Sequence, residues 1–156
     1  MKPAPRFRRD VADWVLAMPA AAALGFTFQS RGDGRSQTHL RWEPKHSHVP
    51  GAFQAGPIGS LADFTGASAA VTTLPPGSAA ATVDFTVKLL AEARGDLLIA
   101  TGRALTRSGT LIVAAVDIDI VRTDTRSPCA TALVTIRARL PAVGRAETPT
   151  TQQCGR

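Results

Sequence analysis

Aromatic residues are scarce in this chain of 156 residues, making up 5% of it, and tyrosine is absent. This argues against a module that stacks RNA bases on the aromatic side chains of a sheet. Hydrophobic residues nevertheless reach 44% and charged residues 19%, the proportions of a folded globular protein rather than a disordered one. The core must be built mainly from alanine and aliphatic residues, many of them β-branched and suited to strands.

Cysteine is also rare, with only Cys129 and Cys154. They form no C-x-x-C motif and no metal-binding pattern with the three histidines, although His46 and His48 lie close together. Cys129 sits in an apolar stretch and is expected to be buried, whereas Cys154 lies in a polar tail and is expected to be exposed. We therefore expect no metal, no cofactor and no structural disulfide, which suits a cytoplasmic protein.

The sequence contains no apolar run long enough to span a bilayer. Its first residues are similar to a secretory signal peptide, because the basic Arg6–Arg9 precedes an apolar stretch. Asp10 and Asp13 interrupt that order, however, and Pro19 splits the apolar stretch. Apolar residues also recur at helical spacing, so we favour a short amphipathic helix within residues 1–19. A secreted binding module remains an alternative.

Positive charge is in excess, with 18 lysines and arginines against 12 acidic residues and a net charge of +6. The basic residues are spread along the chain, and charge alone does not choose between anionic partners. A polyphosphorylated small molecule satisfies this balance as well as a nucleic acid would. With no zinc-finger spacing and few aromatics, we expect neither a nucleic-acid partner nor a membrane partner.

The first half of the chain predicts a helix, two strands and a second helix. Residues 24–30 alternate and end at a glycine-rich turn, and residues 37–42 read as the second strand of a hairpin. A helix is predicted at about residues 57–73, where Pro57 suits its first turn and Pro75-Pro76-Gly77 ends it. Its glycines lower helix propensity, which predicts very close packing against a neighbouring element.

Four strands with short connections follow, so neighbouring strands are expected to pair antiparallel. In the first of these strands, alternation places Val83 and Phe85 on one face and Thr82 on the other. The four strands are 82–90, 97–106, 111–121 and 129–140.

These elements predict an α+β domain over residues 20–140, in which an antiparallel sheet of about five to six strands wraps around the central helix. Residues 1–19 form an N-terminal segment. Residues 141–156 are rich in Pro, Thr, Gln and Gly and are expected to be disordered. The sheet would keep open edges, so a second subunit is expected to pair with it.

Residues 20–139 resemble, over nearly their whole length, the hotdog-fold acyl-CoA thioesterases of the PaaI-like (phenylacetate-degradation) type. The segment 48–63 is similar to the family's Asn-x-x-Gly-x-x-His-Gly-Gly loop and the helix after it. Residues 18–26 and 82–89 resemble the family's first strand and the strand that follows its helix. The resemblance implies a hotdog fold and a bacterial enzyme that hydrolyses an acyl-CoA to a free acid and coenzyme A. It also implies a homodimer or homotetramer, with coenzyme A present only as part of the substrate.

The resemblance also implies roles for individual residues. Asp63 corresponds to the catalytic carboxylate on the central helix, acting as general base or nucleophile. The backbone N–H of Ala55 corresponds to the donor that polarises the thioester carbonyl, and the hydroxyl of Thr82 corresponds to one that helps hold water. This agrees with elementary chemistry, because a helix N-terminus offers unpaired N–H donors to a developing oxyanion. The alternative for Asp63 is a solvent-facing residue of a partly exposed helix.

The chain departs from the family pattern around the proposed oxyanion donor. Gln54 stands where the family has His, His48 replaces the upstream Asn, and Gly56 keeps the second Gly. Glutamine offers only fixed donors and acceptors, whereas histidine can titrate near neutral pH. A protein that binds acyl-CoA without hydrolysing it therefore remains an alternative. A hotdog dehydratase or hydratase ranks last, since only His48 is near Asp63 for the His–acid pair that it needs.

Three further residues are candidates for binding the phosphates of the substrate. Arg107 and Ser108 lie at a predicted turn, where a nucleotide phosphate could be held, and Lys88 lies on a predicted strand. The alternative is that they are solvated surface residues.

Overall fold

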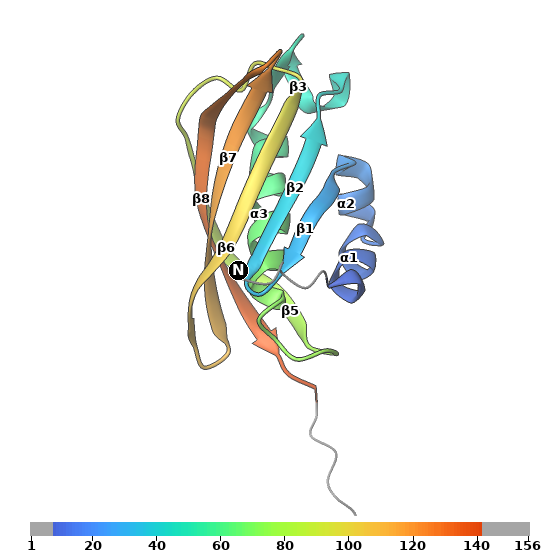
Figure 1. Cartoon of the computed structure of the whole chain (residues 1–156), viewed down its shortest axis with the longest axis vertical. Helices are drawn as coiled ribbons and strands as arrows, with labels where there is room; N and C mark the ends of the chain where they lie inside the picture. Colours follow the sequence, from blue (N-terminus) through green and yellow to red (C-terminus); the bar gives the residue numbers. More distant parts are fainter. Residues whose placement is uncertain (1–7, 142–156) are drawn as a thin grey trace, which may run out of the picture.

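The computed structural model describes residues 8–141 and places a long helix, α3, against one face of a six-stranded antiparallel sheet (Figure 1). The strand order is β1-β2-β6-β7-β8-β5, and a small second sheet pairs β3 with β4. The helices are α1 (Arg9–Leu16), α2 (Pro19–Leu24) and α3 (Ala55–Val71), with a short 3-10 helix, η1 (Pro44–His46). The strands are β1 (Thr27–Gly32), β2 (Arg35–Arg41), β3 (Ser47–Val49), β4 (Ala52–Phe53), β5 (Ala79–Leu89), β6 (Leu97–Ser108), β7 (Leu111–Arg122) and β8 (Thr125–Arg139).

The predicted architecture of a sheet wrapped around a central helix is confirmed. Disorder was predicted for residues 141–156, and of these only residue 141 is among the described residues. The predicted exposure of Cys154 therefore also lies outside the described residues, as do residues 1–7.

Close packing of α3 against the sheet explains its glycines. A Cβ atom added at Gly66 would lie 2.7 Å from Val134 Cγ2 and 3.0 Å from Val116 Cγ2, closer than such atoms can approach. On the sheet side, a Cβ at Gly102 would lie 3.0 Å from the backbone oxygen of Thr65. The loss of helix propensity at Gly66 therefore permits the helix to lie directly on β7 and β8, as the sequence predicted.

The chain before the first strand differs from expectation, because residues 19–24 form the helix α2 rather than the start of a strand. Pro19 occupies the first turn of α2, where its missing N–H costs nothing, and the alanines that follow favour helix. The helix ends at Gly25, whose φ of 80° is the left-handed conformation of a helix C-cap. The first strand therefore begins at Thr27, later than the alternation around Leu24 indicated.

The loop expected between the second strand and the central helix contains the ladder of β3 and β4. Its backbone positions the start of α3, since the Gln54 N–H donates to the His46 carbonyl at 2.8 Å. The buried His46 ring lies within hydrogen-bond distance of the carbonyls of Leu24 and Arg41, so it ties this loop to the sheet. The helix begins at Ala55, two residues earlier than predicted, and Pro57 remains within its first turn.

A β-bulge in β5 changes the predicted face of one site residue. Thr82 pairs with Ile136 and Asp84 pairs with Thr135, so Val83 is an extra residue without a partner. After the bulge, Phe85 pairs with the buried Val134. Thr82 and Phe85 therefore share the face toward α3, and the prediction that they point to opposite faces was wrong.

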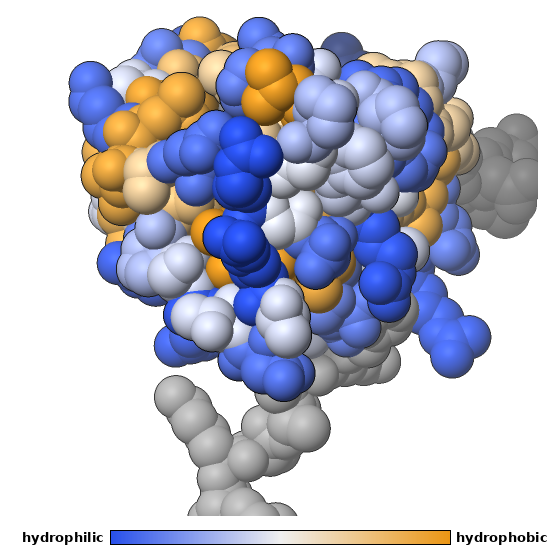
Figure 2. All heavy atoms as spheres, turned by 90° about the horizontal axis from the view of Figure 1, so that it is seen from above, coloured by the Kyte–Doolittle hydropathy of each residue, from blue (hydrophilic) through white to orange (hydrophobic). Residues whose placement is uncertain are grey.

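Strand β5 forms an edge of the sheet and pairs only with β8. Large apolar side chains are exposed along it, with 46% of Phe85 and 53% of Leu89 accessible, and Leu90 follows at 59%. Figure 2, which looks from above, shows hydrophobic residues gathered on one side of the molecule, while charged residues cover much of the rest. An open, apolar strand edge of this kind favours pairing with another chain.

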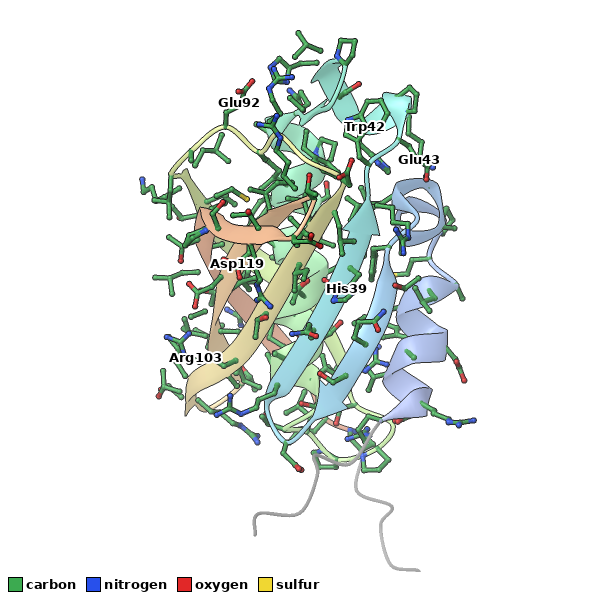
Figure 3. All side chains as sticks on the ribbon, turned by 45° about the horizontal axis from the view of Figure 1, so that its top comes forward. His39, Trp42, Glu43, Glu92, Arg103 and Asp119 are labelled. Atoms are coloured by element: carbon green, nitrogen blue, oxygen red, sulfur yellow. The ribbon has the colours of Figure 1, made fainter. Side chains whose placement is uncertain are left out.

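The outer face of the sheet, away from α3, is polar. Arg103 pairs with Asp117 at 3.5 Å, and Arg126 pairs with Asp119 at 2.6 Å; Figure 3 shows Arg103 and Asp119 on this face. Cys129 is buried as predicted, and burial raises the pKa of its thiol to about 11. Of the helices within residues 8–141, none combines the length and the apolar character that crossing a membrane requires.

Candidate active site

Asp63 lies on α3 beside the edge strand β5. The hydroxyl of Thr82 donates a hydrogen bond of 2.7 Å to Asp63 Oδ1. This contact depends on the bulge at Val83, because the bulge turns Thr82 toward α3. The structure therefore brings together two residues that the sequence proposed for the same site.

Burial raises the pKa of Asp63 above its ordinary value, since the charged form loses solvation. The hydrogen bond from Thr82 acts in the opposite direction, because it stabilises the carboxylate, but it is the smaller effect. Asp63 consequently holds its proton more tightly than an exposed aspartate does. A raised pKa of this kind makes the ionised carboxylate a stronger general base.

A cavity of about 310 Å³ opens beside Asp63, and we call it the Asp63 cavity. Its walls come from α1, α3, β5 and β8, and most of them are apolar. The residues that line it are Trp14, Val15, Met18, Asp63, Phe64, Ala67, Ser68, Val71, Ala80, Ala81, Thr82 and Ile136. An apolar cavity with a carboxylate at its wall suits a small molecule that is apolar on one side and reactive on the other.

A second cavity, of about 410 Å³, lies at the N-terminus of α3, and we call it the helix-start cavity. His48, Gln54 and Ala55 line it together with Leu89 and Glu92, and Figure 3 shows Glu92 on the loop after β5. The structure thus gathers three further predicted site residues, His48, Gln54 and Ala55, in one place.

Of the first two backbone N–H groups of α3, that of Gly56 has a hydrogen-bond acceptor and that of Ala55 has none within residues 8–141. Gln54 is the N-cap residue, and its side-chain oxygen accepts a hydrogen bond of 2.5 Å from the Gly56 N–H. The Ala55 N–H has no carbonyl of its own helix to bind and has no acceptor elsewhere in residues 8–141. Ala55 does not have a positive φ. Among the non-glycine residues of the range 8–141, only Asp33 and Thr123 do. Alanine in place of glycine therefore causes no backbone strain here, and one exposed donor remains.

The carboxylate and this donor do not meet within one chain. Asp63 follows Ala55 by eight residues of helix, which corresponds to about 12 Å along the axis. They also line separate cavities. A single carbonyl group cannot contact both within one copy of the chain.

The predicted phosphate-binding residues lie away from both cavities. Arg107 and Ser108 are in the hairpin between β6 and β7, which Figure 1 shows at the opposite end of the molecule from β3. The Arg107 side chain donates to the Gly109 carbonyl at 3.0 Å. Lys88 pairs with Thr131, whose hydroxyl bonds Asp117 on the outer face of the sheet. Their role in phosphate binding stays a prediction.

The sequence reasoning missed the residues that complete the Asp63 cavity, chiefly Trp14 and Ser68. Trp14 is an apolar residue of α1 that is 44% exposed, and its spacing predicted packing but not the element against which it packs. Ser68 lies in the last turn of α3 and gave no signal of its own. Within residues 8–141, no three side chains of the metal-ligating types gather as an ion would require.

Solved structures of several proteins share this architecture, whereas no family model and no curated protein matches the sequence. A thioesterase family protein from Silicibacter pomeroyi superposes with a TM-score of 0.81 at 23% identity, over 85% of this chain and 98% of that one. A thioesterase from Haemophilus influenzae gives a TM-score of 0.75 at 17% identity, over 90% and 96%.

A putative thioesterase from Ralstonia eutropha, described as phenylacetic acid degradation-related, gives a TM-score of 0.68 at 20% identity, over 81% of this chain and 98% of that one. At these identities the likeness concerns the fold alone. Together with the six-stranded sheet curved around α3, it shows that this chain has the hotdog fold that its sequence led us to expect.

Proposed function

We propose that this protein hydrolyses an acyl-CoA thioester to a free acid and coenzyme A, with Asp63 as general base or nucleophile. The observation that carries the proposal is the partly buried Asp63 carboxyl, which has a raised pKa, accepts a hydrogen bond from Thr82 and faces an apolar cavity. The thioesterases of like fold support the choice of reaction class.

The reaction needs few groups from the protein. Asp63 either takes a proton from a water that attacks the thioester carbon, or attacks that carbon itself before water releases the acid. Negative charge then develops on the carbonyl oxygen, and an N–H at a helix start stabilises it. The C–S bond breaks and the thiolate leaves with the electron pair. A thiolate is a good leaving group, so no strong general acid is needed.

A complete site requires two copies of the chain. The Asp63 cavity borders the Thr82 end of β5, and the helix-start cavity borders its Leu89 end. If two β5 edges pair antiparallel about a two-fold axis, the Thr82 end of one copy meets the Leu89 end of the other. Asp63 of one copy then faces Ala55 of the second. The exposed apolar side chains along β5 would be buried by this pairing.

In this arrangement Gln54 caps the helix, and its amide nitrogen remains available to position the substrate. His48, which is exposed in the helix-start cavity, would contact the part of the substrate near the sulfur. Polar and basic surface residues, with Arg107, Ser108 and Lys88 as the candidates from the sequence, would meet the phosphates of coenzyme A.

A second candidate function is acyl-CoA binding without hydrolysis. It is favoured by the same hydrogen bond that caps α3, because the Gln54 oxygen is committed to Gly56 rather than to a substrate. In that case the cavities would hold the ligand, and Asp63 would not be used.

Release of free thiol from a panel of acyl-CoAs tests the proposal, with Asp63→Asn beside the native protein. Asparagine keeps the shape and an acceptor for Thr82 but cannot take a proton, so we expect kcat to fall by at least about 10²-fold. Asp124→Asn is the matched control, because Asp124 is exposed in the turn between β7 and β8; its activity should equal that of the native protein.

The results distinguish hydrolysis by Asp63 from acyl-CoA binding without hydrolysis. Hydrolysis that survives in Asp63→Asn would remove the carboxylate from the mechanism. Binding of an acyl-CoA by the native protein without any thiol release would establish the binding function instead.

A further inference from the structure

Trp14 lies where the Asp63 cavity meets another cavity. This other cavity, of about 350 Å³, borders the first residues of α1, and we call it the α1 cavity. Trp14 and Val71 line both cavities. We infer that the two cavities are parts of one channel for the acyl group, and that the Trp14 indole closes it and so sets the longest acyl chain that the protein accepts. The inference deepens the proposed function and rests on it for the identity of the ligand as an acyl-CoA.

The residues that line the two cavities follow the same order on neighbouring elements. Along α1 and the start of α2, the lining of the α1 cavity falls within residues 8–11, and that of the Asp63 cavity within residues 15–18, apart from the shared Trp14. At the start of β5, residues 77–79 line the α1 cavity and residues 80–82 line the Asp63 cavity. The two cavities therefore lie end to end between α1 and β5.

The central helix shows the same order. The Asp63 cavity is lined by α3 from Asp63 to Val71, and Val71, the last residue of the helix, also lines the α1 cavity. The reacting carboxylate and the α1 cavity are consequently at opposite ends of the Asp63 cavity. An acyl chain that starts at Asp63 and grows along the cavity walls would reach Trp14 and Val71 before it could enter the α1 cavity.

Of the two residues at this junction, Trp14 is the one whose removal would open it. Val71 is 5% exposed and belongs to the hydrophobic core, whereas Trp14 is 44% exposed and has the larger side chain. Helix α1 is held on the core by Val11 and Val15, each 4% exposed. Replacement of Trp14 therefore removes bulk from the junction and leaves the apolar contacts that anchor the helix.

The α1 cavity suits the continuation of an apolar chain. Val11, Val71 and Ala79 give it apolar walls. Its two charged residues, Arg8 and Asp10, bond each other at 2.7 Å, so their charges are paired. Removal of CH2 groups from water into such a space is favourable, and it becomes available only when the junction is open.

The test measures kcat/KM for straight-chain acyl-CoAs from butanoyl to dodecanoyl with the native protein and Trp14→Ala. In the native protein, kcat/KM should rise with chain length and fall once the chain meets Trp14. In Trp14→Ala the maximum should move to an acyl group longer by at least about two carbon atoms, with about a fourfold gain for each CH2 group that the opened channel newly buries. Butanoyl-CoA, which is too short to reach Trp14, should keep its native kcat/KM.

Leu16→Ala is the matched control. Leu16 is an apolar residue of the same helix, 38% exposed, and it lines neither cavity, so its variant should keep the native maximum. If Trp14→Ala does not fold, Trp14→Phe replaces it, and the smaller ring should move the maximum in the same direction by a smaller amount. A maximum that stays at the native length in the folded Trp14 variant would overturn the inference.

A binding measurement keeps this inference separate from the proposed function. S-alkyl-CoA thioethers cannot be hydrolysed, so calorimetry can compare the dependence of Kd on alkyl length between the native protein and Trp14→Ala. If no thioester is hydrolysed but the length of the tightest-binding thioether increases in Trp14→Ala, the proposed reaction fails and the role of Trp14 holds. If thioesters are hydrolysed through Asp63 and the preferred length is the same in both proteins, the proposed reaction holds and the role of Trp14 is overturned.

Discussion

The start and the middle of α3 place two different kinds of chemical group beside the same edge strand. At the start, the exposed backbone N–H of Ala55 depends on where the helix begins, and almost any side chain leaves it in place. In the middle, Asp63 depends on its own carboxyl group, on its burial and on Thr82. If the proposed site combines the two, we expect it to tolerate Gln and Ala at residues 54–55, where the family that the sequence resembles has His and Gly, but not to tolerate loss of the carboxylate.

Replacement of Ala55 by proline removes the proposed backbone donor, and we expect it to have the largest effect on the rate. Proline removes the N–H, and it is tolerated at the first helical position. Gln54 already has φ −80° and ψ 153°, the extended conformation that a residue before proline needs. We expect a folded protein whose kcat is lower by about 10²–10³-fold, as when one oxyanion donor is lost.

Ala55→Ser is the matched control, because it changes the side chain and keeps the N–H. Its kcat should stay close to that of the native protein, and circular dichroism should report the same helix content for both variants. Native activity in Ala55→Pro would exclude this N–H as the oxyanion donor.

Co-expression of Ala55→Pro with Asp63→Asn tests whether the Ala55 N–H and the Asp63 carboxylate of one site come from different copies of the chain. Each variant alone should be inactive, but a mixed dimer would hold one site with neither defect. With random assembly into two-fold dimers, roughly a quarter of the native activity should return. Copies carrying different affinity tags allow the mixed dimer to be purified and assayed alone. Activity no greater than that of the single variants would place both groups in one chain or in another arrangement.

Most of the fold follows from local patterns in the sequence. The alternation of buried Val116, Ile118 and Ile120 with outward Asp117 and Asp119 predicted β7, and the glycines of α3 predicted its close packing. Helix α2 was missed because Leu24 and Phe26 imitate strand alternation. Pro19 and Gly25 were the stronger signals, since proline starts a helix and glycine ends it.

The site was less accessible to prediction. Asp63, Gln54, Ala55 and His48 were identified through resemblance to a family, and no residue pattern of their own would have selected them. The contact of Thr82 with Asp63 requires the bulge at Val83, and no local signal in the sequence marks an inserted strand residue there. The Asp63 cavity joins α1 to α3 and β5, segments far apart in the chain, so its lining depends on tertiary packing.

Thr82→Val removes the hydrogen bond to the Asp63 carboxylate, and we expect a moderate effect on the pH dependence of activity. The hydrogen bond from Thr82 lowers the pKa of Asp63 against the larger effect of burial, so its loss should raise that pKa further. In the proposed mechanism Asp63 works as a carboxylate, so the acid limb of kcat/KM against pH should move to higher pH. Activity on that limb should fall by up to about tenfold, the equivalent of one hydrogen bond.

Thr86→Val is the control for this change, because Thr86 lies on the same strand and pairs with the exposed Leu133 on the outer face. Its pH profile should match the native one. An acid limb that moves to lower pH in Thr82→Val would contradict the assigned direction of the hydrogen bond.

Asp63→Asn should have a further and smaller effect, on stability rather than on rate. Burial raises the pKa of Asp63 in the folded protein above its unfolded value, so the folded state binds the proton more tightly. The penalty for ionising Asp63 is therefore absent below the unfolded pKa, grows as the pH rises from the unfolded pKa to the folded pKa, and is fully present above the folded pKa. Asparagine is never charged and still accepts the Thr82 hydrogen bond, so the free energy of unfolding at neutral pH should rise by about 0.5–2 kcal/mol.

Urea unfolding of the native protein and Asp63→Asn at acidic and neutral pH measures this difference. The gain should shrink as pH falls below the folded pKa of Asp63, because the native carboxyl is then neutral as well. At the start of α3, Ala55→Ser should cause no pH-dependent change in the free energy of unfolding, because it leaves the charge of the site unchanged. A loss of stability in Asp63→Asn at neutral pH would mean that the carboxylate is held by favourable contacts and is not destabilised by burial. Asp63 would then lack the raised proton affinity on which its proposed role as a base rests.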